Sequence, residues 1–168
     1  MTSAPVIKCE SLYKIFGANA EKMLQSSNGN VDAKTFQDGG CIVGVNNASF
    51  EVLKGEMLVV MGLSGSGKST LLRCISRLTE ATGGKIYIEG EDLLAMNNKQ
   101  LIELRRSKMG MVFQSFALLP HKTVLENIAF PLQIKGSETE DSIKKAMEMV
   151  ELVGLKGREN YFPRELSG

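Results

Sequence analysis

Hydrophobic and polar positions along the chain predict several strands. Residues 6–16 mix apolar and polar side chains, and residues 41–53 alternate them, so each stretch is predicted to be a strand. Residues 57–61 and 109–113 are short apolar runs, which are typical of strands buried on both faces. One more strand is predicted over 85–88. The pattern therefore favours a fold that contains at least one sheet.

Other segments carry apolar residues at helical spacing. Helices are predicted over 71–78, 98–108 and 124–134. Thr123 is placed to cap the third of these, because a threonine hydroxyl can accept a hydrogen bond from a backbone N–H of the first turn. Pro131 lies inside that helix and is expected to weaken or kink it. Strand and helix signals thus occur in one chain, which predicts an α/β fold.

A last helix is predicted to follow a capping box. Ser137 and Glu140 fit the S-x-x-E pattern, in which each side chain bonds to the backbone N–H near the other. The apolar face of this helix is expected to comprise Ile143, Ala146, Met147 and Val150. Gly154 and Gly157 are expected to end it.

Residues 17–40 differ in composition from the strands on either side. A short helix is predicted near 18–25, and the polar run 26–30 is expected to end it. Asp32 is a candidate N-cap for a second short helix that reaches Phe36. We interpret 17–40 as an insertion that is structured but peripheral.

Composition and charge narrow the class of protein. The chain has 168 residues, of which 43% are hydrophobic and 23% charged, as expected for a globular protein. Its formal net charge of +1 gives it no overall attraction to nucleic acid or anionic lipid. Residues 1–11 hold no apolar core of signal-peptide length, and no apolar run approaches the ~20 residues that span a bilayer. Any membrane role is therefore expected to act through a partner.

The cysteines and the histidine give no pattern that indicates a metal site or a C-x-x-C redox site. Cys9, Cys41 and Cys74 are far apart in the sequence and form no C-x-x-C motif, so they are expected to be free thiols in a reducing compartment. His121 is the only histidine, which argues against a cysteine–histidine metal site.

The motif that carries chemistry is G-x-x-x-x-G-K-[ST] at residues 62–69. A phosphate chain presents many acceptor oxygens and dense negative charge, and a glycine-rich loop can turn successive backbone N–H groups toward it. The helix that follows points its positive end at the same phosphates. Because the motif follows a predicted strand and opens a predicted helix, we expect a nucleotide phosphate site here.

Each residue of this motif has an expected role. Lys68 is expected to reach the β- and γ-phosphates, and the Ser69 hydroxyl to bind Mg²⁺. The loop residues expected to bind nucleotide are Gly62, Ser64, Gly65, Ser66, Gly67, Lys68, Ser69 and Thr70. Thr70 occupies the last glycine position of a dinucleotide G-x-G-x-x-G motif, so that motif is not matched.

Further along the chain, two segments resemble a known family. Residues 111–121 resemble the Q-loop region of ABC transporter ATPases, and residues 166–168 resemble the opening of that family's LSGGQ signature. Within the family, the chain looks most similar to the ATP-binding subunits of glycine betaine/L-proline importers. Residues 12–17 followed by an insertion, residues 61–64 at the start of the loop, and residues 113–120 carry that similarity.

The resemblance implies a fold and its parts. The fold would be an α/β P-loop NTPase (RecA-like) core with an antiparallel β subdomain and the start of the ABC helical subdomain, truncated. The β subdomain would span 1–56, with the insertion at 17–40, the core 57–114, and the helical subdomain 115–168. The resemblance also implies that the catalytic carboxylates, the switch histidine and later core strands follow Gly168, so the chain is expected to be an N-terminal fragment that is inactive alone.

The resemblance assigns further site residues. Phe16 would stack on adenine, with Tyr13 as the rival aromatic. Gln114 would contact Mg²⁺ or the attacking water and act as a catalytic residue together with Lys68. Ser167 and Gly168 would contact the γ-phosphate held by a second subunit. His121 precedes the signature and so is not expected to be the switch histidine.

The cofactors implied are ATP and Mg²⁺, and nucleic acid is not expected as a partner. The partners would be a transmembrane permease near residues 116–127, a second ATPase subunit in a head-to-tail dimer and, indirectly, a substrate-binding protein. The chain would lie peripherally at the cytoplasmic face of the inner membrane. Three alternatives stay open: the ATPase of a polyamine or amino-acid importer, a soluble ABC ATPase of DNA repair or translation, and a nucleotide-binding remnant without hydrolysis.

Overall fold

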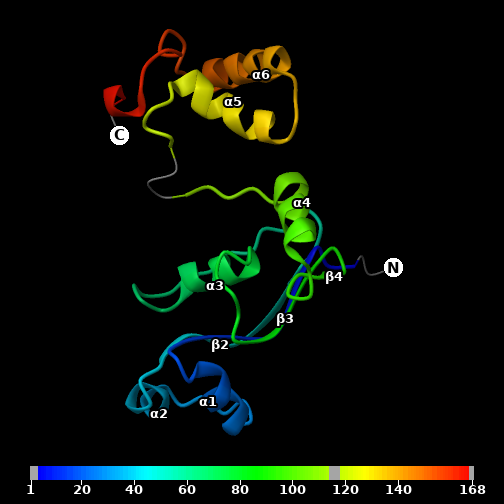
Figure 1. Ribbon diagram of the computed structural model, residues 1–168, viewed down its shortest axis with the longest axis vertical. Coiled ribbons are helices and arrows are strands. Elements are labelled where there is room, and N and C mark those ends of the chain that lie inside the picture. Colours follow the sequence, from blue (N-terminus) through cyan, green and yellow to red (C-terminus); the bar gives the residue numbers. More distant parts are fainter. Residues whose placement is uncertain (1–3, 114–117, 167–168) are drawn as a thin grey trace. The chain divides into compact units, whose positions relative to one another are not determined.

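The computed structural model describes residues 4–113 and 118–166 (Figure 1). The chain divides into two compact units, one up to Leu101 and one from Ile102 onward. Each unit is described by itself.

The first unit is built on an antiparallel four-stranded sheet in the order β2-β1-β3-β4. Its strands are β1 (Ile7–Phe16), β2 (Ile42–Val52), β3 (Gly83–Ile88) and β4 (Glu91–Asp92). The central strand β1 pairs on both sides, so that Cys9 lies opposite Phe50 of β2 and Ile86 of β3. Leu12 and Ile86 are fully buried. The strands predicted over 6–16, 41–53 and 85–88 are confirmed.

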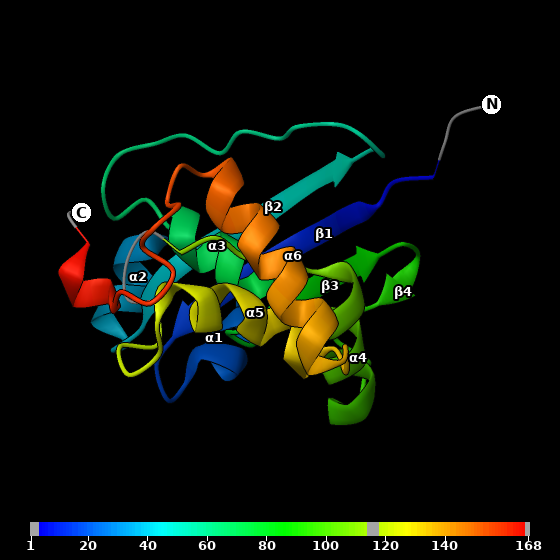
Figure 2. The same ribbon diagram turned by 90° about the horizontal axis from the view of Figure 1, so that it is seen from above.

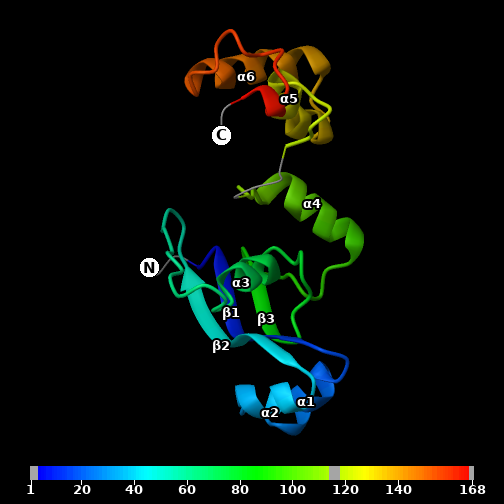
Figure 3. The same ribbon diagram turned by 90° about the vertical axis from the view of Figure 1, so that its left-hand side faces the viewer.

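The insertion forms two short helices at one end of the sheet, as Figure 3 shows. They are α1 (Ala20–Ser26) and α2 (Ala33–Asp38). Asp32 caps α2, since its Oδ2 accepts a hydrogen bond from the Thr35 backbone N–H at 2.8 Å. Phe36 and Ala20 pack with Ile15 of β1 into a small buried cluster. Both helices and the Asp32 cap were predicted and are confirmed.

The two short apolar runs predicted to be buried strands are not strands, and this prediction was wrong. Residues 57–61 and 109–113 have no regular secondary structure. Met57 is 86% exposed and Val59 64% exposed. An apolar run becomes a strand buried on both faces only when other strands pair beside it, and neither run pairs with a strand among the described residues.

Helix α3 belongs to the first unit, and α4 contains the boundary between the two units in the sequence. Helix α3 (Lys68–Ile75) follows the glycine-rich loop and buries Cys74. Helix α4 (Asn98–Lys108) buries Leu101 and Leu104, which are three residues apart and therefore lie on one helix face.

The second unit contains α5 (Val124–Ile134), α6 (Thr139–Leu152) and the 3-10 turn η1 (Pro163–Glu165). Helices α5 and α6 lie side by side (Figures 2 and 3). Thr123 caps α5 as predicted, and a capping box forms because Glu126 Oε2 accepts a hydrogen bond from the Thr123 backbone N–H at 2.7 Å. This hydrogen bond holds the pKa of Glu126 below its ordinary value.

The predicted capping box of α6 does not form. The backbone N–H of Ser137 donates to the carbonyl oxygen of Leu132, so it is not available to the Glu140 side chain, as a capping box requires. Glu138 is the N-cap instead, and it makes no side-chain cap hydrogen bond. Within α6, Ala146 and Val150 are buried as expected. Met147 is 42% exposed, which corrects its placement on the buried face.

No helix among residues 4–113 and 118–166 is both long and apolar enough to cross a membrane.

Candidate nucleotide-binding site

The glycine-rich loop runs directly into the first turn of α3. Gly67 is the residue before the helix and has a φ of 88°, and Gly65 has a φ of 79°. Both angles lie in the left-handed region, which strains any residue that carries a Cβ. The N–H groups of the first helical turn have no partner within the helix, so they are available to an anion in front of the loop.

Lys68 is held by the loop itself. Its Nζ donates to the carbonyl oxygen of Leu63 at 2.6 Å and to Ser66 Oγ at 3.3 Å. The ammonium therefore lies over the loop in which phosphate oxygens would be bound. Neutral oxygens hold a cation less strongly than anionic phosphate oxygens do, so a phosphate could replace these two partners.

A hollow of about 490 Å³ lies between the loop and strand β2. Loop residues line one side and β2 residues the other. Its lining residues are Val43, Gly44, Val45, Asn46, Ala48, Val60, Met61, Gly62, Gly65, Ser66, Gly67, Lys68 and Leu71. This brings together five of the predicted loop residues: Gly62, Gly65, Ser66, Gly67 and Lys68.

Phe16 lies near this loop at the end of β1. A Cβ built on Gly44 would lie 2.9 Å from Phe16 Cε2 and 3.1 Å from Thr70 Cγ2, so the aromatic ring and the first turn of α3 approach the same point of β2. The ring is 43% exposed, and the Lys14 ammonium lies 4.8 Å from its centroid. An exposed ring of this kind can stack on a base.

Tyr13, the rival aromatic, is placed differently. It is only 8% exposed, and its hydroxyl donates to the carbonyl oxygen of Gly29 in the insertion. Its ring is thus enclosed and its polar atom is used in tying the insertion to β1. Phe16 is the better candidate for stacking.

Three predicted site residues, Gln114, Ser167 and Gly168, lie outside the described residues. The structure therefore brings the phosphate loop and Phe16 together and leaves the roles of these three as predictions. Ser64 is an exposed residue of the loop, and Ser69 is an exposed residue of the first turn of α3. Among residues 4–113 and 118–166, no three histidine, cysteine or acidic side chains gather in a way that would hold a metal ion.

The three cysteines are not among the residues that line the hollow beside the loop. Cys9, Cys41 and Cys74 are free and buried. Burial raises the pKa of the Cys9 thiol from 9.0 to about 11, and the nearby Cys74 adds to the effect. A thiol with a raised pKa is a poor nucleophile at neutral pH.

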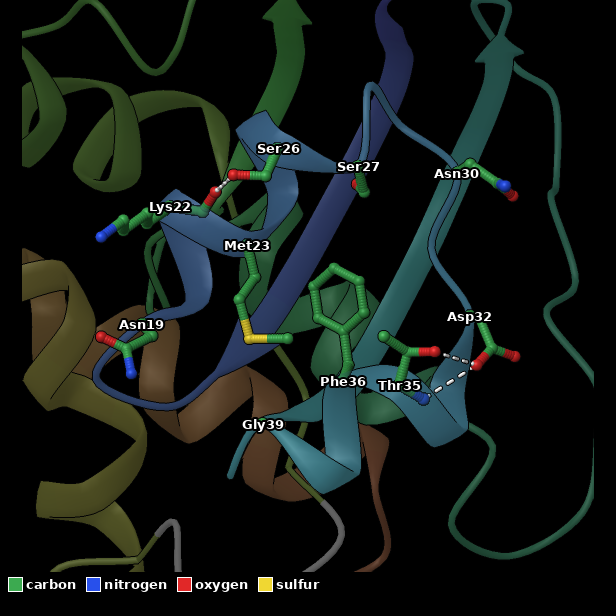
Figure 4. Close-up of a pocket in the computed structure, with 10 residues that line it drawn as sticks. All are labelled: Asn19, Lys22, Met23, Ser26, Ser27, Asn30, Asp32, Thr35, Phe36 and Gly39. Atoms are coloured by element: carbon green, nitrogen blue, oxygen red, sulfur yellow. Dashed lines mark hydrogen bonds between the residues drawn. The ribbon is translucent and has the colours of Figure 1, made fainter.

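A second hollow, of about 610 Å³, lies within the insertion (Figure 4). Met23 of α1 and Phe36 of α2 contribute its apolar part, and Asp32 and Thr35 lie at its polar edge. It shares no lining residue with the hollow beside the phosphate loop.

Gly44 is the residue that the sequence analysis missed. It lies inside a predicted strand, and an isolated glycine there is a signal for a bulge or a close backbone approach. That signal was present in the sequence.

Comparison with known proteins decides the family. The family described as ABC transporter matches residues 45–168. The chain belongs to this family. It is 86% identical over 166 residues to the trimethylamine N-oxide transport system ATP-binding protein of Pelagibacter ubique, covering 99% of this chain and 49% of that protein. It is 48% identical to the glycine betaine transport ATP-binding protein of Bacillus subtilis, covering 96% of this chain and 39% of that protein.

Solved ABC cassettes share the fold. A dimeric ATP-binding cassette in a post-hydrolysis state, bound to ADP and Pi, matches with a TM-score of 0.76 and 30% identity, covering 96% of this chain and 63% of that one. The fold is that of an α/β P-loop NTPase with an antiparallel sheet, as expected. The ABC chain described here spans about half the length of the curated relatives it matches.

Proposed function

We propose that this chain is the nucleotide-binding part of the ATP-binding subunit of an ABC importer for small methylated amines. The observation that carries the proposal is the phosphate loop, in which Lys68 lies over the loop and left-handed glycines shape the backbone in front of α3. The relatives that carry the words trimethylamine N-oxide and glycine betaine in their names support the substrate class.

The loop, the first turn of α3 and Phe16 would each bind a different part of MgATP. The backbone N–H groups of the loop and of the first turn of α3 would bind the β- and γ-phosphates, and Lys68 would neutralise part of their charge. Ser69 would hold Mg²⁺, and Phe16 would stack on the adenine. When bound, Mg²⁺ supplies charge stabilisation to the phosphates.

Hydrolysis is proposed for the whole subunit. In that reaction a water attacks the γ-phosphorus in line, the bond from that phosphorus to the bridging oxygen breaks, and ADP leaves with inorganic phosphate. Gln114 is proposed to orient the water or contact Mg²⁺. A second ATPase subunit in a head-to-tail dimer would add contacts to the γ-phosphate through its own copies of Ser167 and Gly168.

The proposed partners follow from the transport role. A transmembrane permease would contact residues 116–127, and a substrate-binding protein would act through that permease. The chain would lie peripherally at the cytoplasmic face of the membrane. The substrate is selected by these partners, so the chain itself does not determine it.

A second candidate, an amino-acid importer, is favoured by one observation. The chain is 46% identical over 163 residues to a methionine import ATP-binding protein of Desulfitobacterium hafniense, covering 97% of this chain and 42% of that protein.

Uptake measurements test both candidates. Cells that express the complete transporter encoded with this chain are given labelled trimethylamine N-oxide, glycine betaine or methionine. We expect uptake of a methylated amine, and its loss in the Lys68→Ala variant. Uptake of methionine alone would favour the second candidate, and uptake that is unchanged by Lys68→Ala would contradict both.

A further inference from the structure

Strand β2 contains a bulge at Gly44. Lys14 lies opposite Val45, and the next residue of β1, Ile15, lies opposite Val43. Gly44 is therefore an extra residue between two ladder positions. Bulges of this kind bend a strand and re-aim the groups beside them.

The bulge brings Gly44 against the glycine-rich loop. A Cβ built on Gly67 would overlap the Gly44 carbonyl oxygen, so the two backbones cross in direct contact. Gly67 also has a left-handed φ, and both the conformation and the space thus require glycine at position 67.

The position that a Cβ of Gly44 would occupy faces two residues that are proposed to bind the nucleotide, Phe16 and Thr70. Its built Cβ would lie 2.9 Å from Phe16 Cε2 and 3.1 Å from Thr70 Cγ2. A real Cβ at 2.9 Å from a ring atom does not occur without movement. The Lys14 ammonium also lies against this ring, 4.8 Å from its centroid. An added methyl group would therefore push the ring away from the first turn of α3.

We infer that Gly44 is a positioning residue that sets the separation between the aromatic that stacks on the base and the loop that binds the phosphates. A nucleotide has a limited reach from base to β-phosphate, so both subsites contribute fully to affinity only when they are correctly spaced. The inference rests on the proposed nucleotide binding. It goes further by giving a role to a residue that touches neither base nor phosphate.

The test compares a ligand that uses both subsites with one that uses the loop alone. Calorimetry of the 168-residue chain with MgATP and with magnesium tripolyphosphate is carried out for the natural sequence and for Gly44→Ala. We expect Gly44→Ala to weaken MgATP binding by about tenfold and tripolyphosphate binding by no more than about twofold. The matched control is Gly110→Ala, because a Cβ there meets nothing within 4 Å and its φ is not left-handed. This control should leave both affinities unchanged.

A double-mutant cycle shows whether Gly44 acts through the ring. In a Phe16→Ala background, Gly44→Ala should have little further effect on MgATP binding, because the ring that it would displace is gone. If Gly44→Ala does not fold, as judged by its thermal unfolding, the same comparison is made with Gly44→Ala combined with Thr70→Ser. That combination removes the methyl group that the new Cβ would meet at 3.1 Å.

The outcomes separate the two proposals. If the natural chain does not bind MgATP, the proposed function fails. If the natural chain binds MgATP and Gly44→Ala binds it equally well, the positioning role is overturned. Equal losses for MgATP and tripolyphosphate would also overturn it, because Gly44 would then support only the loop.

Discussion

Lys68 Nζ donates to the carbonyl oxygen of Leu63 at 2.6 Å, so the glycine-rich loop folds around its own cation. Ser66 Oγ accepts a second hydrogen bond from the same ammonium. The positive charge is thereby placed before any ligand arrives, and a phosphate has only to replace two neutral oxygens. This arrangement is the basis of the account of nucleotide binding.

Replacing Phe16 should weaken nucleotide binding more than replacing Tyr13. Stacking of a base on an aromatic ring contributes about 1–3 kcal/mol, so Phe16→Ala should weaken MgATP binding roughly 5- to 150-fold. Tyr13→Phe removes only the hydrogen bond to Gly29 and should leave the affinity unchanged while lowering the unfolding temperature. Fluorescence titration with a labelled ATP checks this. A loss of affinity in Tyr13→Phe with none in Phe16→Ala would reverse the assignment.

The segment before α5 depends on one side chain. Asn127 accepts a hydrogen bond from the Leu119 backbone N–H at 2.8 Å, and its amide donates to the carbonyl oxygens of Leu119, Lys122 and Thr123. Asn127→Ala should destabilise the chain by roughly 1–3 kcal/mol, because these backbone groups lose their partner.

Hydrogen exchange can locate that effect. The backbone N–H groups of residues 119–123 should exchange faster in Asn127→Ala, whereas those of β1 should change little. The exposed Glu148→Gln is a suitable control in the same unit. Unchanged exchange across 119–123 would show that Asn127 does not fasten the segment.

Local signals in the sequence predicted much of this fold. Asp32 and Thr123 cap their helices as expected, because a cap depends on residues within one turn of it. Ser137 and Glu140 failed as a capping box, since the carbonyl oxygen of Leu132 takes the backbone N–H that Glu140 would have accepted from. Residues 57–61 failed as a strand because a strand needs partners from elsewhere in the chain.

The candidate site was predictable in part for the same reason. The loop and Lys68 are contiguous in sequence, and their motif identifies them. The crossing of Gly44 with Gly67 depends on the register between β1 and β2, which no local pattern reports. The glycine inside the strand was a signal, but only the register shows what approaches it.

The Cys9 thiol should make the protein less stable in alkaline solution. Its pKa rises from 9.0 to about 11 on folding, so the folded state holds the proton more tightly than the unfolded state. This contribution to stability is fully present below pH 9 and is lost as the pH rises toward 11. Unfolding by urea at a series of pH values should show a decline over this window that is smaller in Cys9→Ala. An identical decline in Cys9→Ala would contradict the prediction.

The 168-residue chain should hydrolyse ATP slowly by itself. Hydrolysis is proposed for the whole subunit, whereas the chain spans about half the length of its curated relatives, and no residue assigned to the site is proposed as the general base. Turnover measured by phosphate release should fall well below the about 1 s⁻¹ at the lower end of typical enzymes. Turnover at ordinary rates that Lys68→Ala abolishes would refute this expectation.

Nucleotide binding by the chain is the central claim, and calorimetric titration with MgATP tests it most directly. The natural chain should bind MgATP saturably at a single site. Lys68→Ala should weaken this binding by about tenfold or more, because a charge-assisted hydrogen bond to a phosphate contributes about 1.5–3 kcal/mol. Absence of binding by the natural chain, or equal affinity in Lys68→Ala, would contradict the account.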